Sequence, residues 1–358
     1  MKSDGGSVIG GILEGQIGNE LVQMEHRDIL KDKTVLITGG TGSFGQAFTK
    51  KVLTEYGPRK VIIYSRDEYK QYMMHKKFEA YEEQLRFFLG DIRDKARLYR
   101  AFEGVDYVVH AAALKQVPAL EYNPTEAVNT NVMGADNIVD AAIDRGVKKV
   151  IAISTDKAVN PINLYGATKL VAEKIFVAAN AYGGGRVKFS AVRYGNVVGS
   201  RGSVVPLFMR LKKEGIKEFP ITDERMTRFW ITLGQGADLV MKALEEAEGG
   251  EIFVPKIRST RIVDLAKVIE PNCTFKFTGI RPGEKLHESL ISYDEARNVK
   301  EFDGIYVVLP QASETTRALP KYGRYPSVPE GFVLRSDRED ILLSQDELRE
   351  MLKEIEIE

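Results

Sequence analysis

The chain has 358 residues, which is enough for one large domain with a second lobe or for two modest domains. Hydrophobic residues make up 43% and charged residues 28%, and this composition excludes disordered, collagen-like and membrane proteins. The 51 Lys and Arg residues balance the 51 Asp and Glu residues, so no long-range field is available to attract nucleic acid or an anionic membrane.

The single cysteine, Cys273, cannot form an internal disulfide, which suits a reducing compartment, and we expect a cytoplasmic location. The four histidines lie far apart in the sequence, so we predict no metal site. No apolar run approaches the length of a membrane span, and residues 1–20 do not form the apolar core of a signal peptide. We therefore expect a soluble protein that binds neither nucleic acid nor a membrane.

Residues 1–30 are Gly-rich and then charged, and we expect them to form an N-terminal extension outside the main fold. From Thr34 onward, short β-branched runs alternate with amphipathic helical stretches. The runs lie at 34–38, 61–64, 86–89, 106–109 and 149–153. This alternation predicts an α/β fold with a Rossmann-type doubly wound parallel sheet, which binds ligands at the carboxyl ends of its strands.

After Tyr194 the pattern loosens and glycine and proline become more frequent. We expect residues 31–195 and 229–257 to form the cofactor-binding Rossmann domain, the second range adding one more helix and strand. Residues 196–228 and 258–358 are then expected to form a smaller C-terminal substrate-binding lobe. Its acidic end, 337–358, is typical of a solvated amphipathic helix.

A glycine-rich turn follows the first predicted strand and leads into a helix that begins near Gln46. Glycines there permit a tight turn and let backbone N–H groups approach a pyrophosphate at the helix N-terminus. The alternative is a surface turn, which the strand before it and the helix after it disfavour. The candidate cofactor-binding residues of this turn are Gly39, Thr41, Gly42, Ser43, Phe44 and Gly45.

The second predicted strand ends in Ser65 and Arg66, where NAD-preferring proteins usually place a carboxylate. A hydroxyl and a guanidinium suit a 2′-phosphate, so the sequence favours NADP as the cofactor. The alternative is that Arg66 is a solvated charge and Asp67 binds the ribose. After the third strand, Asp91 could accept a hydrogen bond from an adenine amino group or could cap a helix over 92–101.

Tyr165 and Lys169 are four residues apart in a predicted helix, so their side chains share one face. An ammonium beside a phenol lowers the pKa of the phenol from its reference of about 10. Tyr165 could then take a proton from a sugar hydroxyl while a hydride leaves. This spacing is common in ordinary helices, and it gains weight only from its position after the cofactor site.

The predicted strand at 149–153 is followed by Thr155, Asp156 and Lys157. A simple dehydrogenase needs the hydroxyl of Thr155 to hold its substrate, but it needs no acid or base directly after it. An elimination needs both, because a base takes the hydrogen of carbon 5 while an acid protonates the departing hydroxyl of carbon 6. Asp156 as the acid and Lys157 as the base fit, provided that burial raises the pKa of the carboxyl and lowers that of the ammonium. The alternative is an ordinary charged pair.

Residues 193–206 offer an amide, two guanidinium groups (Arg193 and Arg201) and several backbone N–H groups. Such donors could bind a nucleotide diphosphate. Basic clusters at 226–228 and 281–285 could add to this site, although each could also be a solvated rim of a loop.

Taken together, these stretches resemble the UDP-N-acetylglucosamine 4,6-dehydratases (inverting) of pseudaminic acid biosynthesis, which belong to the extended short-chain dehydrogenase/reductase group. The resemblance covers roughly residues 30–290 and fades after about residue 310, and residues 1 to about 28 precede the usual start. The matching motifs are TGGTGSFG, SRDE, HAAALKQVP, STDKAVNPINLYGATK, RYGNVVGSRGSVVP, MTRFWIT, GGEIFVPK and GIRPGEKLHE.

This resemblance implies that Lys157 is the base at carbon 5, that Asp156 is the acid, and that Tyr165 and Lys169 serve the redox step. The implied product is UDP-2-acetamido-2,6-dideoxy-β-L-arabino-hex-4-ulose, formed with inversion at carbon 5 and internal hydride transfer through NADP. A homo-oligomer, often a hexamer, is also implied. Further cofactor contacts are expected at Ile92, Ala111, Lys115, Thr130 and Val197. A UDP-sugar is expected to contact Lys115, Asn196, Arg201, Gly202, Ser203, Val204, Val205, Pro206, Arg228, Arg281 and Glu284.

Two other functions are compatible with much of this pattern. A sugar-nucleotide epimerase or dehydrogenase of the same fold would share the glycine turn, Thr155, Tyr165 and Lys169, but it would leave Asp156 and Lys157 without a role. A non-catalytic scaffold that binds NADP would keep the fold without the chemistry, and the intact Tyr and Lys pair argues against it.

Overall fold

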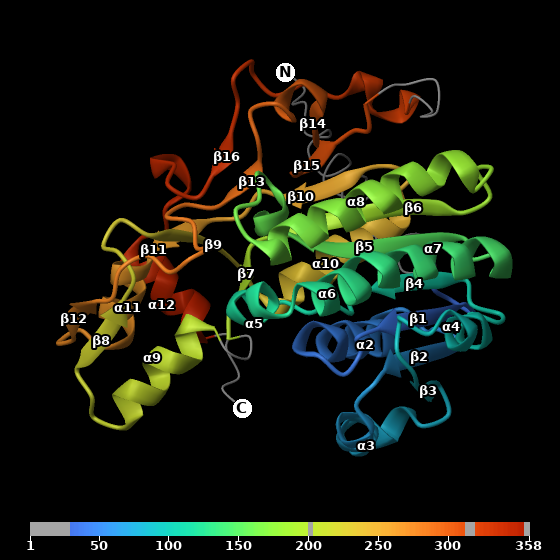
Figure 1. Ribbon diagram of the computed structural model, residues 1–358, viewed down its shortest axis with the longest axis horizontal. Helices are drawn as coiled ribbons and strands as arrows, with labels where there is room; N and C mark the ends of the chain where they lie inside the picture. The colour runs from blue at the N-terminus through green and yellow to red at the C-terminus, as the bar shows by residue number, and fades with distance from the viewer. Residues whose placement is uncertain (1–28, 200–202, 312–318, 354–358) are drawn as a thin grey trace, which may run out of the picture.

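A nine-stranded sheet forms the centre of the computed structural model, which describes residues 29–199, 203–311 and 319–353 (Figure 1). Its parallel strands are β1 (Thr34–Thr38), β2 (Lys60–Ser65), β3 (Leu85–Leu89), β4 (Tyr107–His110), β5 (Lys149–Thr155), β6 (Lys188–Tyr194) and β10 (Ile252–Pro255). They lie side by side in the order β3-β2-β1-β4-β5-β6-β10. This order confirms the predicted α/β class with a Rossmann-type doubly wound parallel sheet.

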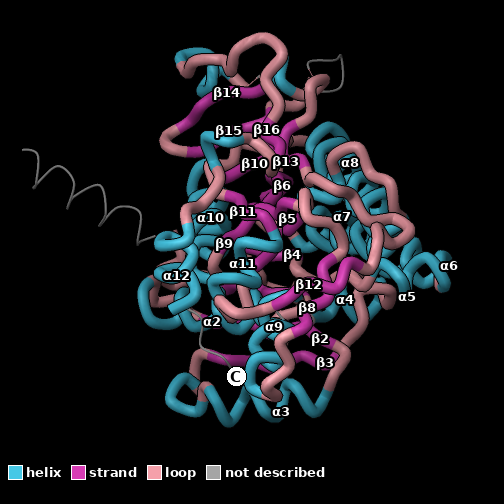
Figure 2. The backbone as a smooth tube through the Cα atoms, turned by 90° about the vertical axis from the view of Figure 1, so that its left-hand side faces the viewer, coloured by secondary structure: helices cyan, strands magenta, loops and turns pink. Residues whose placement is uncertain are grey.

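Helices cover both faces of the sheet (Figure 2). On one face, α2 (Ser43–Glu55) packs against α10 (Leu233–Glu246), and on the other face α7 (Gly134–Arg145) packs against α4 (Lys95–Ala101) and α8 (Leu164–Tyr182). The remaining helices of this domain are α3 (Glu68–Lys77), α5 (Val117–Tyr122), α6 (Pro124–Ala127) and a π-helical turn, Val128–Met133. Short 3₁₀ turns lie at Glu79–Tyr81, Asp156–Ala158, Ala296–Asn298, Pro320–Arg324 and Glu339–Ile341.

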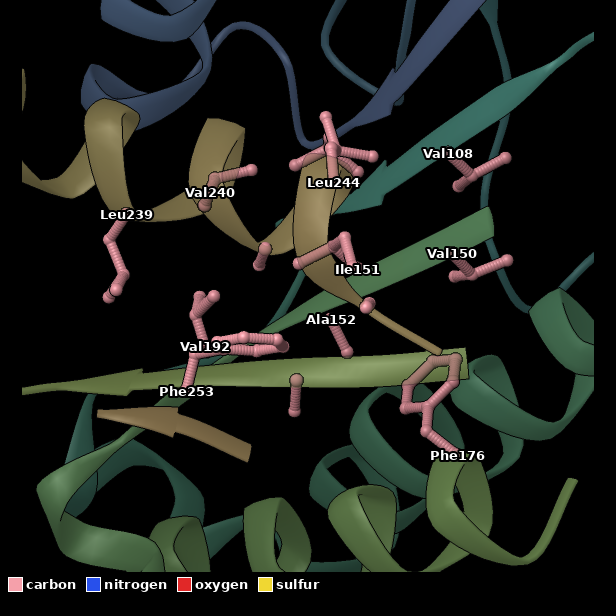
Figure 3. Packing of buried hydrophobic residues seen from close by; sticks show 14 of the residues in the cluster. Val108, Val150, Ile151, Ala152, Phe176, Val192, Leu239, Val240, Leu244 and Phe253 are labelled. Carbon is pink, nitrogen blue, oxygen red and sulfur yellow. The ribbon is translucent and has the colours of Figure 1, made fainter. Parts of the chain in front are cut away.

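The inner strands of the sheet are largely buried, as expected for a parallel sheet with helices on both faces, whereas the edge strand β3 is partly exposed. All five residues of β1 are buried. In Figure 3, Leu239, Val240 and Leu244 of α10 face the strands from one side, and Phe176 of α8 faces them from the other. Each large side chain buried in this way stabilises the fold by about 1.5–3 kcal/mol.

The smaller lobe has a hydrophobic core of its own, which includes Phe208, Phe219, Trp230 and Leu265. Its helices are α9 (Val204–Lys213), α11 (Ile262–Ile269) and α12 (Gln345–Lys353), seen at the left of Figure 1. Its strands form three small sheets: β7 (Asn196–Val197), β9 (Thr227–Ile231) and β11 (Ser259–Arg261); β8 (Glu218–Ile221) with β12 (Thr274–Phe277); and β13 (Ser289–Ile291) with β16 (Leu334–Arg335).

Two segments depart from the expected division between domain and lobe. Within 229–257, α10 and β10 join the large sheet as expected, but β9 pairs with β7 and β11 in the lobe. Within 258–358, β14 (Val299–Phe302) and β15 (Ile305–Val308) extend the large sheet through antiparallel pairing of β15 with β10. The reason is that β10 would otherwise leave an open edge, which the apolar β15 covers.

The residues of the expected N-terminal extension up to 28 lie outside the described residues, and so do Arg201 and Gly202. Among the helices that the structure describes, none combines the length and the apolar character needed to cross a membrane.

Candidate active site

A cleft of about 890 Å³ lies at the carboxyl ends of the parallel strands. Every residue predicted to bind the cofactor lines it: Gly39, Thr41, Gly42, Ser43, Phe44, Gly45, Ser65, Arg66, Asp91, Ile92, Ala111, Lys115, Thr130, Tyr165, Lys169 and Val197. The sequence reasoning missed other lining residues: Tyr64, Lys70, Gly90, Gln116, Ile153, Gly195 and Leu233. For Tyr64, Gly90 and Ile153 the available signal was their position at or just after a predicted strand, whereas Lys70 and Leu233 lie in helices and carried no such signal.

The glycine turn brings the backbone close to the cleft. Gly39 has a φ of +66°, and a Cβ there would lie 2.8 Å from the backbone of Ala112. A Cβ at Gly45 would lie 2.4 Å from the carbonyl oxygen of Gly40. Only glycine fits at both positions. These close approaches let α2 begin at the cleft, where the N–H groups of its first turn can bind an anion.

Three residues that line the cleft carry buried hydroxyls without a partner. Within the described residues, the Oγ1 of Thr130 and the Oγ atoms of Ser154 and Ser203 are buried and have no hydrogen-bond partner. Buried hydroxyls are normally hydrogen-bonded, so each is suited to a polar atom of a ligand. The glycine turn and these hydroxyls fit a dinucleotide.

At the end of β2, Arg66 is half exposed and lies 3.3 Å from a carboxylate oxygen of Asp91. The carboxylate of Asp67 is already engaged, because it caps α3 by accepting from the N–H of Lys70 at 2.9 Å and also pairs with the Lys70 ammonium. This engagement weakens the alternative in which Asp67 binds the ribose.

Asp91 lines the cleft, but its carboxylate is held by Arg93 at 2.7 Å as well as by Arg66. Burial raises the pKa of Asp91, and the hydrogen bonds from Arg93 more than reverse this, so the net change is downward. The alternative in which Asp91 caps a helix over 92–101 is wrong. That helix begins at Lys95, and its N-cap is Asp94.

Tyr165 and Lys169 both lie on the first turns of α8 and line the cleft, as predicted. Gly166 lets this helix start close to the turn at Asp156–Ala158, because a Cβ on residue 166 would lie 2.1 Å from the carbonyl oxygen of Lys157. Burial lowers the pKa of Lys169 to about 8, against the opposing effect of Glu173. Burial raises the pKa of Tyr165, although the sequence predicted a lowered pKa. The positive charge of Lys157 lowers this pKa in part, but burial has the larger effect.

Thr155 ends β5, and Asp156 and Lys157 form the 3₁₀ turn that follows. The Thr155 hydroxyl donates to Oδ1 of Asp156 at 2.9 Å, and the Lys157 ammonium lies 3.0 Å from the same oxygen. Lys157 also donates to the side-chain oxygen of Asn196 at 3.3 Å. Lys157 lines the cleft, whereas Asp156 is fully buried behind it. Both side chains are therefore part of the site and neither points into bulk water.

The charge state of Lys157 differs from the expectation. Burial lowers its pKa, but the carboxylates of Asp156 and Glu288 reverse this, and the net pKa is raised. Glu288 comes from the second lobe, and its Oε1 lies 3.5 Å from Nζ of Lys157. The sequence reasoning missed Glu288, because no local spacing connects residues 131 positions apart. Lys157 is thus an ammonium in the resting protein.

Only some of the predicted substrate-binding residues line the cleft, namely Lys115, Asn196 and Ser203. Val204, Val205 and Pro206 form the first turn of α9, and Val205 is buried in the lobe core. Arg228, Arg281 and Glu284 do not line the cleft.

The guanidinium groups of Arg193 and Arg228 are bound to other groups of the protein and do not face the cleft. Arg228 is buried and donates to the carbonyl oxygens of Thr227, Leu286 and Lys285. Arg193 is buried and pairs with Glu173 at 2.7 Å and with Glu295 at 3.0 Å. The expectation that Arg193 binds a diphosphate is therefore wrong, because both its carboxylate partners already satisfy it. Arg281 is exposed and pairs with Glu284 at 2.8 Å.

The comparison with known proteins agrees with this geometry. The family model "Polysaccharide biosynthesis protein" matches residues 35–310. The chain is 51% identical to UDP-N-acetylglucosamine 4,6-dehydratase (inverting) from Campylobacter jejuni over 332 residues, covering 90% of this chain and 98% of the relative. The chain belongs to this family of 4,6-dehydratases.

Other relatives and solved structures are similar to most of the chain. UDP-glucose 4-epimerase from Rickettsia akari is 44% identical over 283 residues, covering 77% of this chain and 82% of that one. The X-ray structure of Pen from Bacillus thuringiensis has a TM-score of 0.82 at 38% identity, covering 90% of this chain and 98% of its own. The dTDP-glucose 4,6-dehydratase DesIV from Streptomyces venezuelae, solved with NAD and TYD bound, has a TM-score of 0.65 at 24% identity over 71% of this chain and 86% of its own, which shows the shared fold.

Proposed function

We propose that the protein is a UDP-N-acetylglucosamine 4,6-dehydratase that inverts carbon 5 and forms UDP-2-acetamido-2,6-dideoxy-β-L-arabino-hex-4-ulose, the first step toward a pseudaminic acid-type sugar. The Campylobacter relative supports this substrate and reaction. The observation that carries the proposal is the buried turn of Asp156 and Lys157 beside Tyr165. This turn supports the proposal because an elimination needs an acid and a base beside the redox tyrosine, whereas a simple redox enzyme needs neither.

Tyr165 and the residues of the Thr155–Lys157 segment each have a task in the proposed reaction. A bound nicotinamide cofactor supplies the acceptor and later the donor of a hydride. Tyr165, in its phenolate form, takes the proton of the hydroxyl on carbon 4 while the hydride leaves that carbon, and the resulting ketone acidifies the hydrogen on carbon 5. Lys157, which faces the cleft, removes that hydrogen. Asp156 takes this proton from the Lys157 ammonium, which lies 3.0 Å from its Oδ1, and passes it through the Thr155 hydroxyl to the hydroxyl that leaves carbon 6 as water.

We also propose that the cofactor is NADP. The Arg66 guanidinium is half exposed at the end of β2, and the nearby Asp67 carboxylate is engaged with Lys70. A charge-assisted hydrogen bond to a 2′-phosphate is worth about 1.5–3 kcal/mol. The cytoplasmic location, the homo-oligomer and its expected hexameric form stay predictions.

Arg66→Ala is expected to weaken NADP binding roughly tenfold to a hundredfold and to leave NAD binding nearly unchanged, because only NADP carries the 2′-phosphate. Titration calorimetry with both cofactors measures the two dissociation constants. Arg86→Ala, on the edge strand β3 and outside the cleft, is the matched control. Equal losses for NAD and NADP would show that Arg66 does not recognise the 2′-phosphate.

Incubation of the protein with UDP-N-acetylglucosamine, followed by NMR and by absorbance near 340 nm, tests the function. We expect a 4-keto-6-deoxy product with no accumulation of reduced cofactor, because the hydride returns to the substrate in every turnover. Steady accumulation of NADPH would identify a dehydrogenase, and a product that differs only at carbon 4 would identify an epimerase.

A further inference from the structure

Glu288 is a buried carboxylate from the second lobe that the mechanism above does not use. Its side chain is 3% exposed. Its backbone is fixed on both sides by Ser336, which accepts from the Glu288 N–H at 3.0 Å and donates its own N–H to the Glu288 carbonyl at 2.9 Å. The side chain is therefore held in place against the turn that carries Lys157.

The two oxygens of Glu288 have different surroundings. Oε1 lies 3.5 Å from Nζ of Lys157. Within the described residues, Oε2 is buried and has no hydrogen-bond partner. The Lys285 ammonium lies 3.8 Å from it and donates to the carbonyl of Val159 instead. An ionised buried carboxylate with an unsatisfied oxygen is costly, and a neutral carboxylic acid is less so.

The charged groups around Lys157 and Glu288 come from several elements of the fold. Oδ1 of Asp156 lies 3.0 Å from the same Nζ of Lys157, so one ammonium serves two buried carboxylates. Burial raises the pKa of Glu288, the negative charge of Asp156 adds to this, and Lys157 opposes it. The other charged or titratable groups that face Lys157 or Glu288 are Arg228, Lys285, Lys115 and Tyr165.

We propose that Glu288 receives the proton of Lys157 and so converts Lys157 into the free amine that removes the hydrogen of carbon 5. One N–H bond of Lys157 breaks and one O–H bond forms on Oε1. An ammonium and a carboxylate become an amine and a carboxylic acid, with no change in net charge and no proton released to water. Glu288 acts through Lys157 and is thus a positioning residue, and the inference rests on the proposed function.

This exchange has a characteristic dependence on pH. While the pair holds one proton, the share of molecules with a neutral Lys157 does not depend on pH, so the parent kcat is expected to be level across neutral pH. Glu288→Gln cannot accept the proton, and Lys157 must then release it to water. Its kcat is expected to be at least about tenfold below that of the parent at pH 7 and to rise about tenfold per pH unit, with KM near the parent value.

The experiment measures kcat and KM from pH 6.5 to 9 for the parent, Glu288→Gln and Glu288→Asp, with thermal unfolding and NADP binding as checks of folding. Glu288→Asp, which keeps a carboxyl group, is expected to retain a level profile at a lower rate. Glu301→Gln removes a carboxylate from a surface pair with Lys256 and is the matched control, with parent behaviour expected.

Two results would overturn the inference. One is a parent profile that already rises tenfold per pH unit across neutral pH, which requires no variant to fold. The other is a Glu288→Gln profile with the parent shape, whether at the parent rate or uniformly lower, which would leave Glu288 a structural role. Either result, obtained with the 4-keto-6-deoxy product still formed, leaves the proposed function intact, whereas absence of that product from the parent would remove the function itself.

Discussion

Lys157→Ala is expected to lower the rate of 4-keto-6-deoxy product formation by about a hundredfold to ten-thousandfold, because the variant lacks the base for carbon 5. NADP binding is expected to persist, since the glycine turn and the end of β2 are untouched. Rates of product formation by NMR and a cofactor titration measure both quantities. The two effects together distinguish a lost base from a lost binding site.

Loss of stability must be separated from loss of chemistry in this variant. Removal of the ammonium leaves Asp156 and Glu288 buried without it, so a lower unfolding midpoint is also expected. Assays are therefore run well below that midpoint. Lys256→Ala, which breaks a surface pair with Glu301, is the control. Turnover of Lys157→Ala at the parent rate would show that the base is assigned to the wrong residue.

Arg193→Met is expected to reduce the free energy of unfolding by about 3–5 kcal/mol, because it leaves Glu173 and Glu295 without their buried cation. Arg193 also donates to the carbonyl of Leu290 and thus ties β6 to the second lobe. Denaturant unfolding of the parent and the variant measures the difference. Met keeps most of the side-chain volume, so a cavity contributes little.

Arg349→Met is the control for this prediction, because its partner Asp346 is exposed and such surface pairs contribute about 0–1 kcal/mol. An Arg193→Met protein with parent stability but weaker binding of the UDP-sugar would contradict the structural role and would restore Arg193 as a phosphate ligand.

The features that could be predicted from the sequence are those encoded by neighbouring residues. The parallel sheet follows from short apolar strands such as Thr34–Thr38, and the cofactor turn from glycines beside a strand and a helix. The cleft gathers the predicted cofactor residues because the carboxyl ends of parallel strands meet at one edge.

The features that could not be predicted depend on contacts between distant residues. Arg193 is paired with Glu295 across 102 positions, and nothing near Arg193 distinguishes it from a phosphate-binding arginine. The guanidinium of Arg228 likewise donates hydrogen bonds to the carbonyl oxygens of residues 285 and 286, which the sequence does not reveal. The pKa of Lys157 is raised instead of lowered, because the adjacent Asp156 and, in addition, Glu288 from the other lobe stabilise the ammonium. The charge states of buried groups therefore could not be predicted without knowledge of the fold.

The central claim is elimination across carbons 5 and 6, and NMR of the product formed from UDP-N-acetylglucosamine in D₂O tests it most directly. The account predicts a 4-keto-6-deoxy sugar that carries deuterium at carbon 5 with inverted configuration. A product that retains its carbon 6 hydroxyl and its original hydrogen at carbon 5 would contradict it.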